Sequence, residues 1–152
     1  MEAKFFEDWH VGDQIETMGR TVGDSEISQF IALGGFFEEL FMNQDFIEKS
    51  SPYPSRIAPG ALIFAFTEGL IILTGCIHRV GLALISVEQM NFKLPLRVGD
   101  TMRVRVTATE TRATSRSERG IVTFHHAVLN QRDEQIMECT VKRMLRSRGA
   151  AA

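Results

Sequence analysis

The segment from Ser55 to Leu73 constrains the fold of this chain more than any other part of the sequence. It opens with a Pro-Gly turn at Pro59 and Gly60 and continues as a nearly all-apolar run, which predicts a helix. Apolar residues lie on every side of that helix, so other parts of the protein have to enclose it. With about 13 residues the helix is too short to span a bilayer, which takes about 20. We therefore predict a buried core helix covered by a sheet.

Length and composition are those of an ordinary globular protein. The 152 residues most simply form one domain, 1–152, with a core of its own. A net charge of −2 gives no reason to expect nucleic acid or a membrane surface as a partner. The first residues lack the basic and then apolar layout of a signal peptide, so we expect a cytoplasmic protein. Cys76 and Cys139 have no metal-ligand spacing and are expected to be buried thiols.

The chain changes character at the central helix. Before it, Gln14 to Val22 resembles a short strand, and a helical pattern runs from Asp24, a plausible N-cap, to Gly34 and Gly35. The apolar segment 36–46 has no regular period. After the helix the pattern is that of strands, expected at 82–92, 101–111, 121–130 and around 137–145. Residues 111–120 are expected to form an exposed connection, and 146–152 a frayed tail.

One buried helix, a shorter helical segment and at least four mostly antiparallel strands predict an α+β fold. A sheet wrapped around a central helix, the arrangement called a hot dog, accounts for all of these elements. It leaves much of one face uncovered, which favours a homodimer or a larger homo-oligomer.

Several stretches resemble the MaoC-like dehydratase, or (R)-specific enoyl-CoA hydratase, family. The resemblance covers nearly the whole chain, and it rests on the order and spacing of the stretches together. They are Phe6-Glu7-Asp8 with Val11-Gly12-Asp13, Arg20-Thr21-Val22, Ser55-Arg56-Ile57-Ala58 with Gly60, Leu94-Pro95-Leu96 with Val98-Gly99-Asp100-Thr101, Gly120-Ile121-Val122, and Asn130-Gln131.

This resemblance implies a ligand and a reaction. Members of the family bind acyl thioesters of coenzyme A or of acyl carrier protein, at sites on the interface of a hot-dog dimer. They add or remove water across the 2,3 bond of the acyl chain. An Asp and a His in the segment Gly-Asp-x-Asn-Pro-x-His-x-Asp transfer the protons, beside backbone N–H groups that hold the thioester oxygen. No metal or redox cofactor is implied.

The chain departs from the family pattern at the decisive positions. Phe36 stands where the Asp is expected, and Phe41 stands where the His is expected. Pro59 replaces the His of the Ile-Ala-His-Gly motif that often precedes the helix. Because phenylalanine cannot transfer a proton, the usual mechanism is absent on this alignment.

Three carboxylates are the candidates for replacing the lost chemistry. Glu38 and Glu39 fill the Asn and Pro positions of the dyad segment, where they serve as an acid and a base or simply face solvent. Glu68 lies in the buried helix, where an unpaired carboxylate is costly. Its spacing from Pro59 resembles that of the catalytic acid in hot-dog thioesterases of the phenylacetyl-CoA type. The alternative, which we favour, is a structural Glu68 that reaches a backbone group or an arginine across the dimer.

The features expected to bind the thioester are better preserved in this sequence than the residues expected to transfer protons. The N–H groups of Gly60 and Ala61 begin the helix and can receive a thioester oxygen. The other expected lining residues are Ile57, Pro59, Phe36 and Phe41. Three functions remain open: a hydratase that uses displaced carboxylates, an acyl-CoA thioesterase that uses Glu68, and a non-catalytic member that binds acyl thioesters or pairs with an active homologous subunit.

Overall fold

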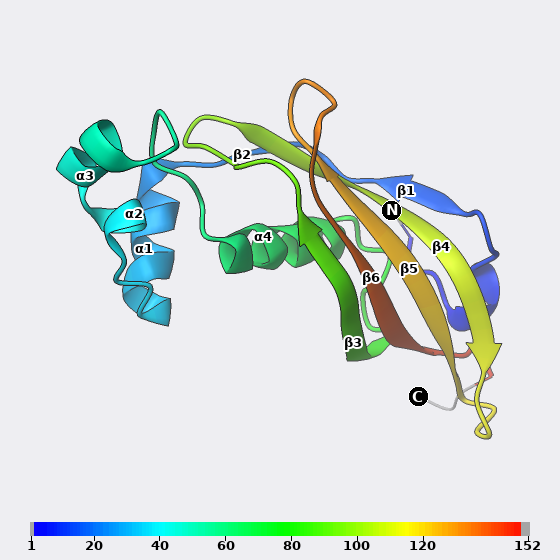
Figure 1. Cartoon of the computed structure of the whole chain (residues 1–152). Helices are drawn as coiled ribbons and strands as arrows, with labels where there is room; N and C mark the ends of the chain where they lie inside the picture. The colour runs from blue at the N-terminus through cyan, green and yellow to red at the C-terminus, as the bar shows by residue number, and fades with distance from the viewer. Residues whose placement is uncertain (1, 150–152) are drawn as a thin grey trace.

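The structure is a computed structural model that describes residues 2–149. Its helices are α1 (Asp24–Gly34), α2 (Glu39–Met42), α3 (Gln44–Ser50) and α4 (Gly60–Leu73), and a 3-10 turn, η1 (Phe6–Asp8), lies near the N-terminus. The strands are β1 (Gln14–Glu16), β2 (Arg20–Thr21), β3 (Gly81–Phe92), β4 (Thr101–Ala113), β5 (Arg119–Leu129) and β6 (Gln135–Arg146). The expected α+β arrangement is confirmed, because a curved sheet covers α4 while α1 to α3 form an arm beyond it (Figure 1).

The sheet has six strands in the order β1-β4-β5-β6-β3, and β2 also pairs with β4. All of these pairings are antiparallel. The last three strands in the sequence form a meander at the centre of the sheet, whereas β1 and β3 lie at its two edges. The sheet therefore joins the end of the chain to the strand that directly follows α4.

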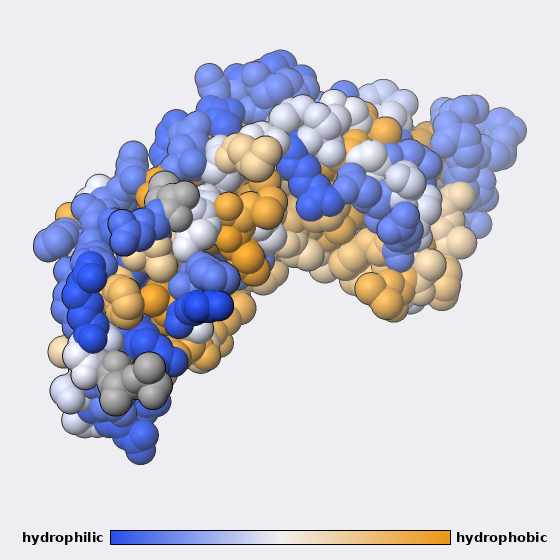
Figure 2. Space-filling model, turned by 180° about the vertical axis from the view of Figure 1, so that it is seen from behind, coloured by the Kyte–Doolittle hydropathy of each residue, from blue (hydrophilic) through white to orange (hydrophobic). Residues whose placement is uncertain are grey.

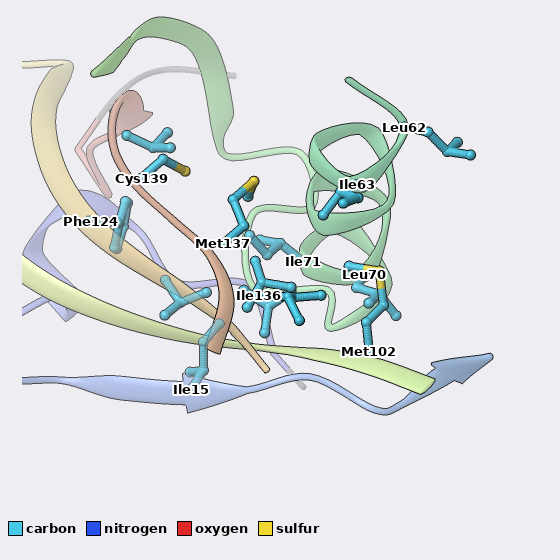
Figure 3. Packing of buried hydrophobic residues seen from close by; sticks show 14 of the residues in the cluster. Ile15, Leu62, Ile63, Leu70, Ile71, Met102, Phe124, Ile136, Met137 and Cys139 are labelled. Carbon is cyan, nitrogen blue, oxygen red and sulfur yellow. The ribbon is translucent and has the colours of Figure 1, made fainter. Parts of the chain in front are cut away.

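The core lies between α4 and the inward face of the sheet. The alternation expected in β4 is confirmed, because Met102, Val104, Val106 and Ala108 are all buried. Figure 3 shows Ile63 and Ile71 of α4 among side chains from the sheet, including Ile136 and Met137 of β6. Burying aliphatic side chains of this size contributes roughly 1.5–3 kcal/mol each, so this layer carries most of the stability of the fold.

The prediction that α4 is enclosed on all sides is wrong for the single chain. Leu62, Ile63, Leu70 and Ile71 are buried, but Ile72 is 59% exposed and Leu73 is 68% exposed. One sheet covers only one side of a helix, so the opposite apolar side is left open. None of the helices among the described residues is long and apolar enough to cross a membrane.

The segments before α4 contain more structure than the sequence pattern indicated. The strand expected at 14–22 is two short strands, because Thr17 bonds Val104 through both its backbone and its hydroxyl and interrupts the regular pairing. Asp24 is not the N-cap of α1: Gly23 occupies that position, and its N–H donates to the Glu26 carboxylate at 2.8 Å. Gly35 ends α1 in the left-handed conformation, with φ of 71°, as its position predicted.

The aperiodic segment 36–46 contains helix α2 and the beginning of α3. Both helices are short, and the Asn43 side chain separates them by accepting a hydrogen bond from the N–H of Phe46 at 3.1 Å. A helix of one or two turns gives too little periodicity for a pattern to be recognised in the sequence.

Two expectations near the C-terminus are corrected. The connection predicted at 111–120 is shorter, because β4 continues to Ala113 and β5 begins at Arg119. The tail predicted at 146–152 is ordered over its described first part. Ser147 is buried and its N–H donates to the Glu118 carbonyl at 2.8 Å, and Arg148 pairs with Asp8 at 2.6 Å. Residues 150–152 lie outside the described residues.

An apolar surface borders the edge strand β3. Leu82, Leu84 and Ile85 are each more than 40% exposed, and Phe92 at the other end of β3 is 48% exposed. In Figure 2 hydrophobic side chains gather along the concave underside of the molecule, between the sheet and the α1 to α3 arm. A large contiguous apolar surface next to an unpaired strand is typical of an interface.

Candidate functional site

The start of α4 is fixed by the strand-like residues that precede it. Ile57 forms a β-bridge with Arg97, and the Ala58 N–H donates to the Leu96 carbonyl at 2.8 Å. The Pro59 carbonyl accepts from the N–H groups of Leu62 and Ile63, which closes the first turn. The N–H groups of Gly60 and Ala61 have no acceptor among the described residues. They point out of the positive end of the helix, where an anionic or carbonyl oxygen is stabilised.

Phe92 of β3 lies directly against this helix start. A Cβ atom added at Gly60 would lie 2.8 Å from Cζ of the Phe92 ring, closer than real contacts allow. Glycine at position 60 therefore permits the aromatic ring to approach the helix backbone. The unpartnered N–H groups of Gly60 and Ala61 thus lie beside an aromatic ring.

The two phenylalanines at the expected dyad positions are part of the packing around the core. Phe36 and Phe41 are both partly buried against it, and the Phe36 ring stacks at a tilt on Phe30 with 5.2 Å between ring centres. Neither side chain carries a group that can exchange a proton. These two positions therefore carry no acid or base.

Arg56 connects the phenylalanine segment to the start of α4. Its Nε donates to the Phe41 carbonyl at 2.6 Å, and its guanidinium also bonds Asp24 and Ser28 of α1, each at 2.8 Å. The side chain is only 16% exposed. One arginine therefore holds α1, α2 and the residues before α4 together.

Glu38 and Glu39 are exposed at the beginning of α2. They border an open hollow of about 630 Å³, together with Phe37, Met42, Asn43, Gln44 and Asp45. Both carboxylates are open to solvent there. The structure does not bring them together with Glu68.

Glu68 lies inside the molecule and is paired. Its carboxylate accepts from Arg143 of β6, and its Oε1 lies 3.9 Å from Nδ1 of His126 on β5. The Glu68 and Arg143 side chains are only 18% and 9% exposed. A salt-bridged Glu68 matches the structural alternative, but the arginine belongs to its own chain and is not supplied across a dimer. The Glu68 carboxylate is already bound by Arg143 and is largely buried, so it is not a free carboxylate that could meet a thioester.

The sequence analysis did not identify Arg143 and His126 as partners of Glu68. Their inward-facing positions on β6 and β5 nevertheless indicated that each is buried. On β6, residues 137, 139, 141 and 145 alternate inward, and Arg143 occupies the same phase. His126 occupies the inward phase of β5 between Phe124 and Val128 and has no exposed surface. A charged or polar residue on an inward phase requires a buried partner. Glu68 is the acidic residue of the helix that these strands cover.

The protein environment changes the pKa values of two side chains in this group, His126 and Cys139. Burial, with the nearby Arg143 and His125, lowers the pKa of His126 from 6.5 to about 3. Burial and the Glu68 charge raise the pKa of the Cys139 thiol to about 11. At neutral pH the imidazole is therefore uncharged and the thiol is protonated, so the Cys139 thiol is not an activated nucleophile.

Comparison with known proteins identifies the family. The family model described as "FAS1-like, dehydratase domain region" matches residues 9–139. The (R)-specific enoyl-CoA hydratase of Rhodospirillum rubrum is 31% identical over 106 residues, which are 69% of both chains. The chain belongs to the MaoC-like dehydratase family. Protein MaoC of Klebsiella aerogenes is 30% identical over 105 residues, which are 68% of this chain but only 30% of that longer protein.

Solved structures show that this MaoC-like chain has the expected fold. The MaoC-like dehydratase from Rhodospirillum rubrum matches 97% of this chain and 100% of its own with a TM-score of 0.85 and 25% identity. A Mycobacterium tuberculosis protein with a double hot-dog fold matches 99% of this chain and 46% of its own, with a TM-score of 0.86 and 18% identity. The hot-dog prediction is confirmed, and this chain corresponds to about half of the double structure.

Proposed function

We propose that this chain is an acyl-thioester-binding member of the MaoC-like family that lacks the usual hydration chemistry. The observation that carries the proposal is the contrast between Phe36 and Phe41 at the dyad positions and the unpartnered N–H groups at the start of α4. The hydratase named above acts on enoyl-CoA, which supports a coenzyme A or acyl carrier protein thioester as the ligand. The proposal includes no metal or redox cofactor.

Each part of the surface at the start of α4 has a role in such binding. The Gly60 and Ala61 N–H groups receive the thioester oxygen at the positive end of α4. Phe92 and the partly buried Phe36 and Phe41 offer apolar walls to the acyl chain. Ile57 and Pro59 are buried and hold the helix start in place. Binding is retained on this account, and proton transfer is lost.

We propose further that two copies associate along β3. This strand is an edge of the sheet, so half of its backbone N–H and C=O groups face outward. Leu82, Leu84 and Ile85 surround that edge with exposed apolar area. A two-fold axis would pair β3 with the β3 of a second copy in antiparallel orientation. This pairing would give the outward backbone groups partners and would cover the apolar residues.

Incubation with crotonyl-, octenoyl- and phenylacetyl-CoA tests the binding proposal. Absorbance of the 2,3 double bond, release of free thiol and the melting temperature are followed in the same samples. We expect a raised melting temperature without loss of absorbance and without thiol. Hydration that disappears in Glu38→Gln with Glu39→Gln would support the hydratase alternative, and thiol release lost in Glu68→Gln would support the thioesterase. An unchanged melting temperature with every thioester would contradict binding.

The variant Ala61→Pro tests the role of the helix start. It removes one N–H that α4 does not use, and proline is tolerated in the first helical turn. We expect the thermal shift caused by acyl-CoA to fall by at least half. Ala65→Ser, an exposed position one turn later on α4, is the matched control and should retain the full shift.

A further inference from the structure

Two arginines lie opposite each other where the sheet ends. Arg119 begins β5 and Arg146 ends β6, and the register of the two strands pairs them directly. Residues paired in this way have Cβ atoms about 5 Å apart and side chains on the same face. The neighbouring pair, Gly120 with Leu145, is buried on the inner face, so both arginines lie on the outer face of the sheet. Two positive charges placed like this repel each other.

Part of each arginine side chain is withdrawn from solvent without gaining a partner. Nε of Arg119 and Nε of Arg146 are both buried and have no hydrogen-bond acceptor among residues 2–149. A buried, unpaired N–H group of a cation is costly, and such groups are rare in native proteins. An anion between the two guanidinium groups would relieve both the repulsion and the missing hydrogen bonds.

The arginines without a carboxylate partner gather at this end of the sheet. The arginines that form ion pairs are Arg20, Arg56, Arg103, Arg105, Arg132, Arg143 and Arg148. Six have no ion pair among the described residues, and four of these lie at the sheet end: Arg112, Arg116, Arg119 and Arg146. Arg112 is opposite Ile121 and therefore a diagonal neighbour of Arg119 on the outer face. Figure 1 shows the β4–β5 connection and the end of β6 at the same end of the sheet.

The acidic residues nearest to this group leave it positive. Glu118 precedes Arg119 in the chain, and Glu110 lies two residues before Arg112. Neither carboxylate forms an ion pair within the described part of the chain, and Glu110 accepts a hydrogen bond from the Thr123 hydroxyl at 3.3 Å. The four guanidinium groups therefore outnumber the carboxylates at the sheet end.

We propose that Arg119 and Arg146, with Arg112 beside them, bind a phosphoryl anion on the outer face of the sheet. Guanidinium groups bind phosphate oxygens through paired N–H donors. A phosphate group carries about 1.5 to 2 negative charges at neutral pH, against one for a carboxylate, so it suits adjacent arginines better. Both side chains are long and flexible, so their Nε–H groups can turn toward the bound oxygens.

This site is separate from the start of α4. Met137 pairs with Phe92, which lies against Gly60, and it precedes Arg146 by nine residues on β6. Nine residues of a strand span about 30 Å. The arginines also lie on the outer face, whereas α4 packs against the inner face. The phosphoryl site is therefore additional to the proposed thioester site, and either can exist without the other.

Thermal unfolding in inorganic phosphate and inorganic diphosphate tests the phosphoryl site, with sodium chloride at equal ionic strength as the reference. We expect both anions to raise the melting temperature of the wild-type protein in a saturable way, with diphosphate binding more tightly. Arg119→Met together with Arg146→Met should weaken diphosphate binding at least tenfold. A wild-type protein that responds to diphosphate no more than to chloride would overturn the proposal.

Arg105→Met together with Arg132→Met is the matched control. It removes the same charge, but Arg105 pairs with Glu16 at 3.1 Å and Arg132 pairs with Glu134 at 2.7 Å. Diphosphate binding should be retained in this control, and equal weakening in both double variants would contradict a specific site. In chloride alone, the variant without Arg119 and Arg146 should melt no lower than wild type, because a repulsive contact is removed. A markedly lower melting temperature would mean that these side chains already have partners in the protein.

Coenzyme A and the variant Ala61→Pro identify the source of the phosphoryl group. Coenzyme A contains both a diphosphate and a separate phosphate group. Competition between coenzyme A and inorganic diphosphate would assign the site to the thioester carrier, and its absence would assign the site to a free phosphate, with the site supported in either case. Ala61→Pro should leave the diphosphate shift unchanged while it reduces the acyl-CoA shift. Loss of both shifts in this variant would contradict two separate sites.

Discussion

The beginning and the middle of α4 differ in where they keep their polar groups. At Gly60 the neighbouring side chain is the apolar Phe92 ring, and the N–H groups of Gly60 and Ala61 have no acceptor among the described residues. Around Glu68, two turns later, a carboxylate, an imidazole and a guanidinium are gathered out of solvent. The ionisable groups around Glu68 are therefore largely buried and paired, whereas the helix start offers unpartnered backbone N–H groups. Access, more than the presence of titratable residues, separates a catalytic group from a structural one.

The largest effect is expected from breaking the buried ion pair. Arg143→Met leaves the Glu68 carboxylate unpaired in the core and should lower the free energy of unfolding by about 3 kcal/mol. Glu68→Leu together with Arg143→Met should recover most of this loss, because no charge is then left unpaired. Chemical denaturation measures both variants.

Lys142→Met is the control for the ion pair. Lys142 lies next to Arg143 in the sequence but on the outer face of β6, where it pairs with an exposed Glu88 at 2.9 Å. An exposed pair is worth less than about 1 kcal/mol. If the Lys142 and Arg143 variants lost equal stability, the buried group would have no special role.

The next effect is a pH dependence that comes from His126. The pKa of His126 is about 3 in the folded protein and 6.5 when unfolded, so only the unfolded state binds the proton between these values. Its contribution is fully present above pH 6.5 and is lost as the pH falls toward 3. At about 1.4 kcal/mol per pH unit, we expect roughly 2 kcal/mol of this loss between pH 6.5 and 5.

His126→Leu should remove that slope, and the unfolding free energy as a function of pH measures it. The charged or titratable groups facing His126 are Glu68 on α4 and Arg143 and Cys139 on β6, with His125 beside it on β5. The Cys139 thiol stays protonated over this range because its pKa is about 11. Equal slopes in wild type and variant would show that His126 titrates normally in the folded state.

A smaller effect is expected at the sheet edge beside α4. Leu84→Arg places a charge in the exposed apolar surface of β3 and should weaken dimerisation at least tenfold, which corresponds to about 1.4 kcal/mol. Sedimentation equilibrium measures the change. Val11→Arg, in a turn where Val11 is 66% exposed, should leave association unchanged. A Leu84→Arg protein that still dimerises like wild type would place the interface elsewhere.

The smallest effect is expected at the exposed carboxylates. Glu38→Gln and Glu39→Gln should each change stability by less than about 0.5 kcal/mol, since both side chains face solvent. Acyl-CoA binding should also be unchanged, because the N–H groups of α4 remain. Thermal shift with and without ligand checks both statements. A large loss of binding would mean that these carboxylates face the ligand in the assembled protein.

The sequence predicted the parts of the fold that follow simple periods. The central helix, the alternating face of β4 and the glycine end of α1 were all recognisable, because each has either a regular spacing or a residue with a special conformation. The short helices α2 and α3 were not, since one or two turns give no period. The exposed side of α4 could not be foreseen from composition, because an apolar residue looks the same whether its own sheet or a second copy covers it.

Some residues of the candidate site could likewise be predicted from the sequence, and others could not. Phe36 and Phe41 could be placed at the dyad positions by resemblance, and the free N–H groups of Gly60 and Ala61 follow from helix geometry alone. The group around Glu68 required the register of two strands. His126 lies opposite Cys139 in that register, and Arg143 follows four residues later on β6. No spacing along the chain shows that His126 and Arg143 meet a helix residue that precedes them by 58 and 75 positions.

The strand order also has a consequence for the way the protein folds. Strands β4, β5 and β6 can pair as soon as each is made, but β3 pairs with β6, the last strand of the sheet. Until β6 is complete, β3 has no strand to pair with, and α4 can pack only against β4 and β5. Contacts of such long sequence separation form slowly and leave apolar segments exposed in the meantime. We therefore expect a nascent chain that ends before Gln135 to remain unfolded and to bind chaperones, even though its central helix has already been synthesised.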